Sequence, residues 1–259
     1  MKITILSLIS LATGFLWWTF PPGTPSQTLE SEAEPLVIRS SGEGFALVEL
    51  FTSQGCSSCP PADRLLRDLL LDTEQKDVYA LSFHVDYWNY LGWQDPYSDV
   101  AFSQRQREYA QKFHSSRVYT PQMIVNGTQE FVGSDRTRAA IAIEKALAKQ
   151  NDAFIALKWY PQSQKLRYEV QGTKEASVLR IALVEKKIEN SVPRGENRGR
   201  KLSHVQVVRQ YESIALERDA VGDLSFKIPK ELDASQLEIV AYVQNQDSWM
   251  VTGATKVEL

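Results

Sequence analysis

The stretch FALVELFTSQGCSSCPPAD, residues 45–63, contains the only two cysteines of the chain, Cys56 and Cys59. Its first half, FALVELFTS, is a short apolar run of the kind that forms a buried strand. After the two prolines, leucines recur at helical spacing between positions 65 and 70, which predicts a helix. The cysteine pair is therefore expected at a strand-to-helix junction, with Cys59 in the first helical turn.

Such a junction favours a reactive cysteine pair. Unpaired backbone N–H groups and the positive end of the helix dipole stabilise a thiolate, so Cys56 should be a better nucleophile than a free cysteine. A loop of the form C-x-x-C can close into a disulfide and reopen by thiol–disulfide exchange. Pro60 and Pro61 are compatible with the first helical turn, because backbone N–H groups there have no intrahelical acceptor to lose.

Three interpretations of the pair are open from the residues alone. We favour an exchangeable dithiol, in which Cys56 attacks and Cys59 resolves. The second interpretation is a copper or zinc site with His84 as a third ligand, although a lone C-x-x-C with a distant histidine is a weak metal pattern. The third is a non-catalytic interaction module whose disulfide stays closed.

Strand-like and helix-like patterns alternate up to about residue 150. The predicted elements after the first helix are a buried strand at 78–85, an aromatic insertion at 86–99, a polar helix at 100–114, a hairpin around Asn126-Gly127 and a helix at 135–150. This order predicts an α/β domain over residues 36–151, with a mixed parallel and antiparallel sheet flanked by helices.

From residue 152 the pattern changes to short alternating or β-branched runs separated by turn residues. No stretch in this part has a helical period. The pattern predicts an all-β sandwich of the immunoglobulin-like kind over residues 152–259, with a domain boundary near residue 151. His204, inside one of these predicted strands, is expected to make only a local hydrogen bond.

The N-terminus predicts export. After Lys2, about eighteen residues without a charge precede a spacer at 21–35 that is rich in Pro, Ser, Thr and Glu. Residues 1–20 are interpreted as a signal peptide or as an uncleaved membrane anchor, and both place the cysteines in an oxidising compartment. The net charge of −3 gives no reason to expect a nucleic-acid partner.

Four segments carry a resemblance to a known family. They are LVELFTSQGCSSCPPAD (47–63), FHVDYWNYLGWQDPYS (83–98), YTPQMIVNG (119–127) and GENRGRKLSHVQVVR (195–209). Over residues 40–259 the chain resembles exported bacterial proteins of the thioredoxin superfamily. The resemblance implies a thioredoxin-like fold, a redox-type site and a location in the periplasm, either free or membrane-anchored.

The resemblance also implies roles for single residues. Pro121 would be a cis-proline that lies against the dithiol and orients the substrate, and Thr120 would precede the cis bond. Glu49 would be the buried acid that manages the proton of the second cysteine. The chain departs from ordinary thioredoxins at Gly55, where an aromatic residue is usual, and in its Ser-Ser loop dipeptide.

The expected activity is that of a thiol–disulfide oxidoreductase without a cofactor. Its substrate would be a protein or a small molecule that carries a thiol or a disulfide. Because the chain has no third cysteine, a separate redox partner protein or a small thiol would have to exchange electrons with it.

Polar and aromatic residues follow the second predicted strand. His84 and Asp86 alternate with apolar residues, so they are expected to share one face near the end of the strand where α/β folds place ligands. They could serve as acid/base groups, contact the substrate (the role assigned to Asp86), bind a metal together or simply cap the insertion by hydrogen bonds. Tyr87, Trp88 and Trp93 could form a substrate-binding wall over the cysteines or pack the insertion onto the domain.

Overall fold

The computed structural model describes residues 36–40, 44–73, 77–173 and 175–259. The predicted leader at 1–20 and the predicted spacer at 21–35 lie outside the described residues. The described residues belong to one compact unit. Among the described residues, no helix combines the length and the apolar character that crossing a membrane requires.

The fold is mixed α/β and consists mostly of strands. The helices of the described part are α1 (Pro60–Asp72), α2 (Val100–Lys112) and α3 (Arg136–Leu147), with short 3-10 helices η1 (Asn89–Leu91) and η2 (Ala234–Gln236). The strands are β1 (Leu36–Arg39), β2 (Ala46–Thr52), β3 (Val78–Val85), β4 (Ser98–Asp99), β5 (Gln122–Val125), β6 (Gln129–Val132), β7 (Phe154–Tyr160), β8 (Lys165–Gln171), β9 (Ser177–Ser191), β10 (Lys201–Leu216), β11 (Ala220–Ser225), β12 (Leu237–Asn245) and β13 (Val251–Glu258).

The strands of the described part form two sheets. The larger sheet is mixed and has the order β13-β12-β9-β10-β3-β2-β5-β6, with β4 paired to β3. In it, β2 runs parallel to β3 and antiparallel to β5, and β3 is parallel to β10. The smaller sheet has the order β1-β7-β8-β11. The predicted mixed sheet with flanking helices is therefore confirmed at this level.

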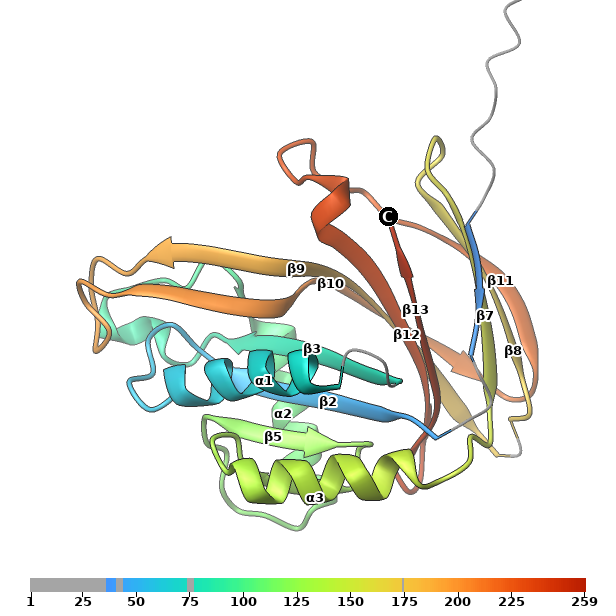
Figure 1. Ribbon diagram of the computed structural model, residues 1–259, viewed down its shortest axis with the longest axis horizontal. Coiled ribbons are helices and arrows are strands. Elements are labelled where there is room, and N and C mark those ends of the chain that lie inside the picture. The colour runs from blue at the N-terminus through green and yellow to red at the C-terminus, as the bar shows by residue number, and fades with distance from the viewer. Residues whose placement is uncertain (1–35, 41–43, 74–76, 174) are drawn as a thin grey trace, which may run out of the picture. The chain divides into compact units, whose positions relative to one another are not determined.

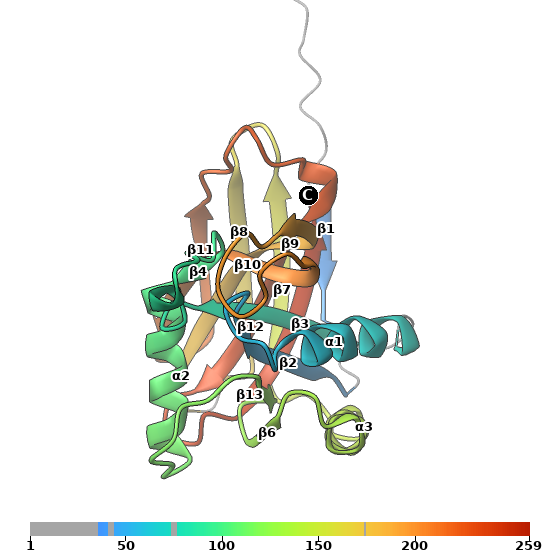
Figure 2. The same cartoon turned by 90° about the vertical axis from the view of Figure 1, so that its left-hand side faces the viewer.

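Helices cover both faces of the large sheet around β2, which is why the strand is buried along its whole length. Val48 and Leu50 pack with α1 and α3, whereas Leu47 and Phe51 pack with α2 on the opposite face. Figure 2 shows α2 on one side of β2 and β3 and the other two helices on the other side. This packing holds the start of α1, and with it the cysteine pair, beside the C-terminal end of β2.

Strands from both sides of residue 151 share the large sheet, which differs from the expectation of two domains with separate sheets. β10 joins the sheet by pairing with β3 at Val207 and Ser82. The other face of the β9–β12 region packs on the smaller sheet through Leu179, Ile181 and Ile239 (Figure 1). A thioredoxin-like domain followed by a self-contained sandwich is not confirmed, because alternation in a sequence does not say which strand edges meet.

The predicted insertion at 86–99 contains only η1 and β4 as regular structure. β4 lies parallel to the last residues of β3. Asp99 then caps α2, because its carboxylate accepts a hydrogen bond from the backbone N–H of Ala101 at 2.8 Å. The insertion thus stays at the end of β3, next to the cysteine pair.

Candidate functional site

Cys56 and Cys59 are joined by a disulfide at the start of α1, with their Cα atoms 5.4 Å apart. Cys59 is the N-cap residue of the helix, and its carbonyl accepts backbone hydrogen bonds from Ala62 and Asp63. The cysteines therefore lie at a strand-to-helix junction, as the sequence indicates. Both cysteines are 0% exposed, although the two serines between them are exposed.

The Thr120–Pro121 peptide bond is cis. We call residues 53–59, between β2 and α1, the cysteine loop. The hydroxyl of Ser58 in this loop donates to the carbonyl of Thr120 at 3.5 Å. On the other side, a Cβ at Gly133 would come within 3.1 Å of Pro121 and 3.2 Å of Ala62 in α1. The absence of a side chain at Gly133 therefore lets the proline pack beside the first turn of the helix.

Two of the three aromatic residues proposed as a substrate wall line the cysteine loop. Trp88 donates its indole N–H to the hydroxyl of Thr120 at 2.7 Å, and a Cβ at Gly55 would lie only 2.9 Å from the Cβ of Trp88. The position before Cys56 has no side chain because Trp88 fills that space. Trp93 donates its indole N–H to the side chain of Gln54 at 3.0 Å.

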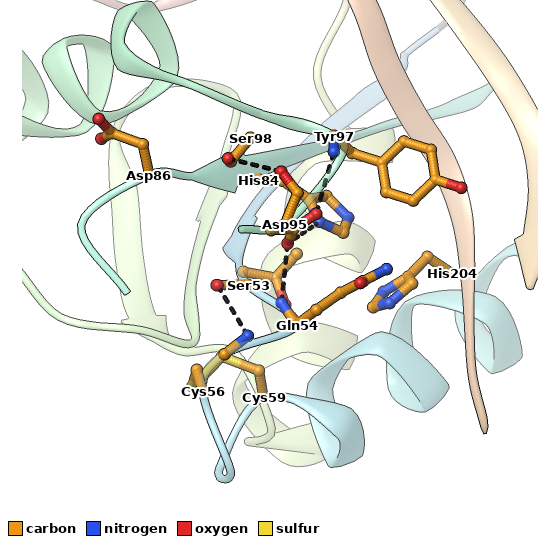
Figure 3. Close-up of polar contacts among 12 residues, drawn as sticks. Ser53, Gln54, Cys56, Cys59, His84, Asp86, Asp95, Tyr97, Ser98 and His204 are labelled. Atoms are coloured by element: carbon orange, nitrogen blue, oxygen red, sulfur yellow. Dashed lines mark hydrogen bonds and ion pairs between the residues drawn. A yellow bond between two sulfur atoms is a disulfide. The ribbon is translucent and has the colours of Figure 1, made fainter. Parts of the chain in front are cut away.

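Tyr87 and Asp86 face α2 instead of the cysteines. The hydroxyl of Tyr87 donates to Gln106 at 3.1 Å, and burial raises the pKa of Tyr87 to about 12. Asp86 accepts a short hydrogen bond from the hydroxyl of Ser103, and its carboxylate points away from His84 (Figure 3). The expectation that Asp86 and His84 share a face is wrong, because β3 ends one residue before Asp86 and the alternation ends with it.

His84 is fully buried and is paired with Asp95. The Nδ1 of His84 lies 2.8 Å from Oδ2 of Asp95, which also accepts the backbone N–H of Gln54 at 2.8 Å (Figure 3). Burial alone would raise the pKa of Asp95, but His84 and the N–H groups of Gln54 and Tyr97 outweigh it and lower this pKa. Asp95 thus connects the histidine to the loop that carries Cys56.

A second buried histidine, His204, comes from β10. Its ring centroid lies 4.7 Å from that of His84, and its Nδ1 lies 3.4 Å from Oδ2 of Asp63. The other carboxylate oxygen of Asp63 accepts from the hydroxyl of Thr52 at 2.9 Å. Burial alone would lower the pKa of His204, but the charge of Asp63 outweighs it and raises this pKa above its ordinary value.

These four residues form a buried His–Asp cluster, defined as Asp95, His84, His204 and Asp63. Each of them is at most 5% exposed. Oδ2 of Asp63, Nε2 of His84 and both ring nitrogens of His204 have no hydrogen-bond partner. Buried polar atoms without partners are costly, so their concentration near the disulfide marks the cluster as a candidate functional site.

Glu49 lies on the face of β2 that α2 covers, so it is not beneath the cysteines. Its carboxylate is 2.7 Å from Nη2 of Arg105 and also accepts hydrogen bonds from the hydroxyls of Tyr109 and Tyr242. The implied role of Glu49 as the acid of the second cysteine does not fit this geometry. The acid on the α1 side is Asp63, one helical turn after Cys59.

The sequence contained a signal for Asp63 that was not used. Side chains four residues apart on a helix are neighbours, so the Asp of CSSCPPAD follows Cys59 on one face of the helix. His204 had no comparable signal, because its place in the site depends on the pairing of β10 with β3. Asp95 reaches His84 only because β4 folds back beside β3.

The described residues contain no group of three or more His, Cys, Asp or Glu side chains arranged to hold a metal ion. His84, the predicted third metal ligand beside the cysteines, has its Nδ1 engaged by Asp95.

The family described as "Protein of unknown function (DUF1223)" matches residues 47–244. The chain belongs to this family. The matched range of this DUF1223 protein includes the disulfide, the cis-proline and the whole His–Asp cluster. No curated protein matches the chain.

Two solved structures are similar to this DUF1223 chain to different degrees. The crystal structure of protein AGR_C_4864 from Agrobacterium tumefaciens is 26% identical, with a TM-score of 0.66, and the match covers 83% of this chain and 95% of that chain. A domain of the outer membrane lipoprotein Omp28 from Porphyromonas gingivalis is 18% identical over 42% of this chain and 88% of that chain. Its TM-score of 0.27 is too low to support an argument.

Proposed function

We propose that this DUF1223 protein is an exported thiol–disulfide oxidoreductase that works through Cys56 and Cys59. The observation that carries the proposal is the position of the disulfide, at the first turn of α1 and against the Thr120–Pro121 cis bond. A helix start is where a cysteine thiolate is stabilised, so the pair has the setting of an exchangeable dithiol.

The strand arrangement around the pair supports a thioredoxin-like assignment for this part of the chain. The order β3-β2-β5-β6, with β2 parallel to β3 and antiparallel to β5, is the arrangement expected of that superfamily. The packing of β9 and β12 on the smaller sheet supports a sandwich-like arrangement for the part after residue 151.

The proposed reaction transfers two electrons. A substrate thiolate attacks the sulfur of Cys56, a substrate–Cys56 disulfide forms, and Cys59 leaves as a thiolate. A second substrate thiolate then attacks the substrate sulfur, and Cys56 leaves. The substrate is oxidised to a disulfide and both cysteines are reduced, or the same steps run in reverse. A partner protein or small thiol must then restore the starting state, since the chain has no other cysteine.

In this reaction the buried His–Asp cluster would take and return the proton of Cys59. Asp63 follows Cys59 by one turn, so their side chains are neighbours on the helix. Its free oxygen, Oδ2, faces His204, and both groups lack any other partner for a proton. Asp63 therefore replaces Glu49 as the acid that we assign to this role.

A second candidate function is favoured by one specific observation. Both cysteines are completely buried, which also suits an interaction module in which the disulfide stays closed. In either case we propose that the protein acts outside the cytoplasm, on the basis of the uncharged N-terminal run at residues 3–20.

The proposal is tested by disulfide transfer to a reduced, fluorescently labelled peptide with two cysteines. We expect the oxidised protein to oxidise this peptide roughly ten times faster than the same concentration of glutathione disulfide at pH 7, because the start of a helix stabilises the thiolate that leaves. The reverse assay uses the reduced protein and the oxidised peptide. Rates equal to the glutathione background in both directions would instead support the closed module.

A further inference from the structure

The loop between β9 and β10 contacts the loop that carries Cys56. We call residues 192–200 of the β9–β10 loop the cover segment. Its backbone is held by its own hydrogen bonds, from Val192 N–H to the carbonyl of Arg200 at 2.9 Å and from Gly199 N–H to the carbonyl of Val192 at 2.8 Å. Figure 2 shows the β9–β10 end of the molecule in front of the loop that leads from β2 to α1. The cover segment thus has its own hydrogen-bonded backbone and lies near the C-terminal end of β2, where the cysteines are.

Asn197 connects the cover segment to the cysteine loop. Its Nδ2 donates one hydrogen bond to the carbonyl of Gln54 and another to the carbonyl of Cys56, both at 2.9 Å. Its Oδ1 accepts from Nη1 of Arg200 at 2.7 Å. The side chain is 0% exposed, and both amide protons as well as the oxygen are used.

Two further contacts join the β9–β10 hairpin to the cysteine loop. The carboxylate of Glu196 accepts the backbone N–H of Ser57 at 3.0 Å. The side-chain amides of Gln54 and Asn190, near the end of β9, exchange hydrogen bonds of 2.6 and 3.0 Å. The backbone N–H of Ser57 and the carbonyls of Gln54 and Cys56 are therefore all hydrogen-bonded to side chains of the cover segment.

The disulfide beside these contacts cannot be reached by an attacking thiol in this arrangement. A thiolate must contact a sulfur to open the bond, and both cysteines are 0% exposed. The cover segment itself is mostly exposed, and the hydrogen bonds that join it to the cysteine loop come from the side chains of Asn197 and Glu196. Its own backbone hydrogen bonds stay within the segment, so they do not have to break if the segment separates from that loop.

We propose that Asn197 closes the cover segment over the disulfide, and that thiol exchange at Cys56 occurs only after this segment lifts. Asn197 is then a specificity-determining residue, since it sets which thiols reach the site. A partner that offers a carboxylate to Ser57 and an amide to the two carbonyls would replace the contacts of the segment as it opens the site. The inference rests on the proposed function for its biological role, but opening itself can be measured separately.

The test is the rate at which dithiothreitol reduces the Cys56–Cys59 disulfide in the whole protein. One thiolate of this dithiol bonds to Cys56 and displaces Cys59, and its second thiolate then closes the reagent's own disulfide and releases Cys56. The reagent is oxidised by two electrons and the protein is reduced. Quenching with acid and counting alkylated cysteines by mass gives the rate.

Asn197→Asp keeps the shape and the contact with Arg200, but it cannot donate to either carbonyl. Losing two hydrogen bonds is expected to raise the reduction rate at least roughly tenfold. The matched control is Glu189→Gln, which removes an acid on β9 whose side chain pairs with Lys187 and Lys201, and its rate should equal that of the wild type. An unchanged rate in Asn197→Asp with an unchanged thermal midpoint would overturn the proposal.

Glu196→Ala keeps the test decisive if Asn197→Asp does not fold. Glu196 is exposed, so its loss leaves the core intact while removing the bond to Ser57. We expect the reduction rate to rise roughly threefold. A rate equal to that of Glu189→Gln would contradict the proposal that the cover segment limits access to the disulfide. A faster reduction of both variants, with no transfer to the labelled peptide, would refute the oxidoreductase function and support the role of the cover segment. Transfer to the peptide with unchanged reduction rates would refute the role of the cover segment alone.

Discussion

Replacing Arg105 with methionine is expected to lower the free energy of unfolding by about 3–5 kcal/mol. Arg105 is 4% exposed, and its guanidinium lies 2.7 Å from the carboxylate of Glu49 and 2.8 Å from the hydroxyl of Tyr242. The substitution keeps an apolar side chain in place but leaves a buried carboxylate without its cation. An unpaired buried charge is among the largest destabilising changes that a single substitution can cause.

This residue also connects parts of the chain that are distant in sequence. Arg105 belongs to α2, Glu49 to β2 and Tyr242 to β12. The guanidinium carbon lies between 4.9 and 6.0 Å from the centroids of five aromatic rings, those of Phe83, Tyr109, Tyr211, Tyr242 and Trp249. Its loss should therefore loosen the attachment of β12 as well as that of α2.

Urea unfolding, followed by circular dichroism, measures the effect. Arg107→Met on the same helix is the control, because the side chain of Arg107 hydrogen-bonds to the exposed side chain of Gln104 and not to a buried carboxylate, and its loss should change the free energy by less than about 0.5 kcal/mol. Adding Glu49→Gln to Arg105→Met should recover part of the loss, since the lone charge is removed. Equal midpoints for the wild type and Arg105→Met would show that the pair contributes nothing.

Substituting either cysteine is expected to abolish two-electron transfer, but the two variants should differ in what they accumulate. Cys59→Ser keeps the attacking thiol and removes the resolving one, so a mixed disulfide with the labelled peptide should persist. Cys56→Ser keeps only the thiol at the N-cap of α1, below the loop, and should form little adduct.

Mass spectrometry of the protein after incubation with the oxidised peptide distinguishes the two variants. We expect adduct on most molecules of Cys59→Ser and on few of Cys56→Ser, with Glu189→Gln showing transfer at the wild-type rate. Adduct on Cys56→Ser but not on Cys59→Ser would reverse the assigned roles. No adduct on either variant would remove the exchange mechanism.

Local patterns predicted the parts of the site that lie close together in sequence. The apolar run before the cysteines and the leucines after them were sufficient to place Cys59 at a helix start. The implied cis bond at Thr120–Pro121 is present as well. These features depend on a few neighbouring residues, and that is why a single sequence can indicate them.

Long-range pairing accounts for most of what was missed. His204 reaches Asp63, and the cover segment reaches the cysteine loop, because β10 pairs with β3, a contact between residues far apart in the chain. Glu49 was assigned without its place in the strand alternation, which points it toward α2 and Arg105. The prediction that Asp86 lies beside His84 was wrong for a related reason, since the strand alternation on which it depended ends at Val85.

The reduction potential of the Cys56–Cys59 pair tests the central claim most directly. It is obtained by equilibrating the protein in glutathione buffers of graded composition and measuring the alkylated fraction at each. An exchangeable dithiol should give a value between about −270 and −120 mV, the range of known exchange-active pairs. A value below about −300 mV, typical of structural disulfides, would contradict the account.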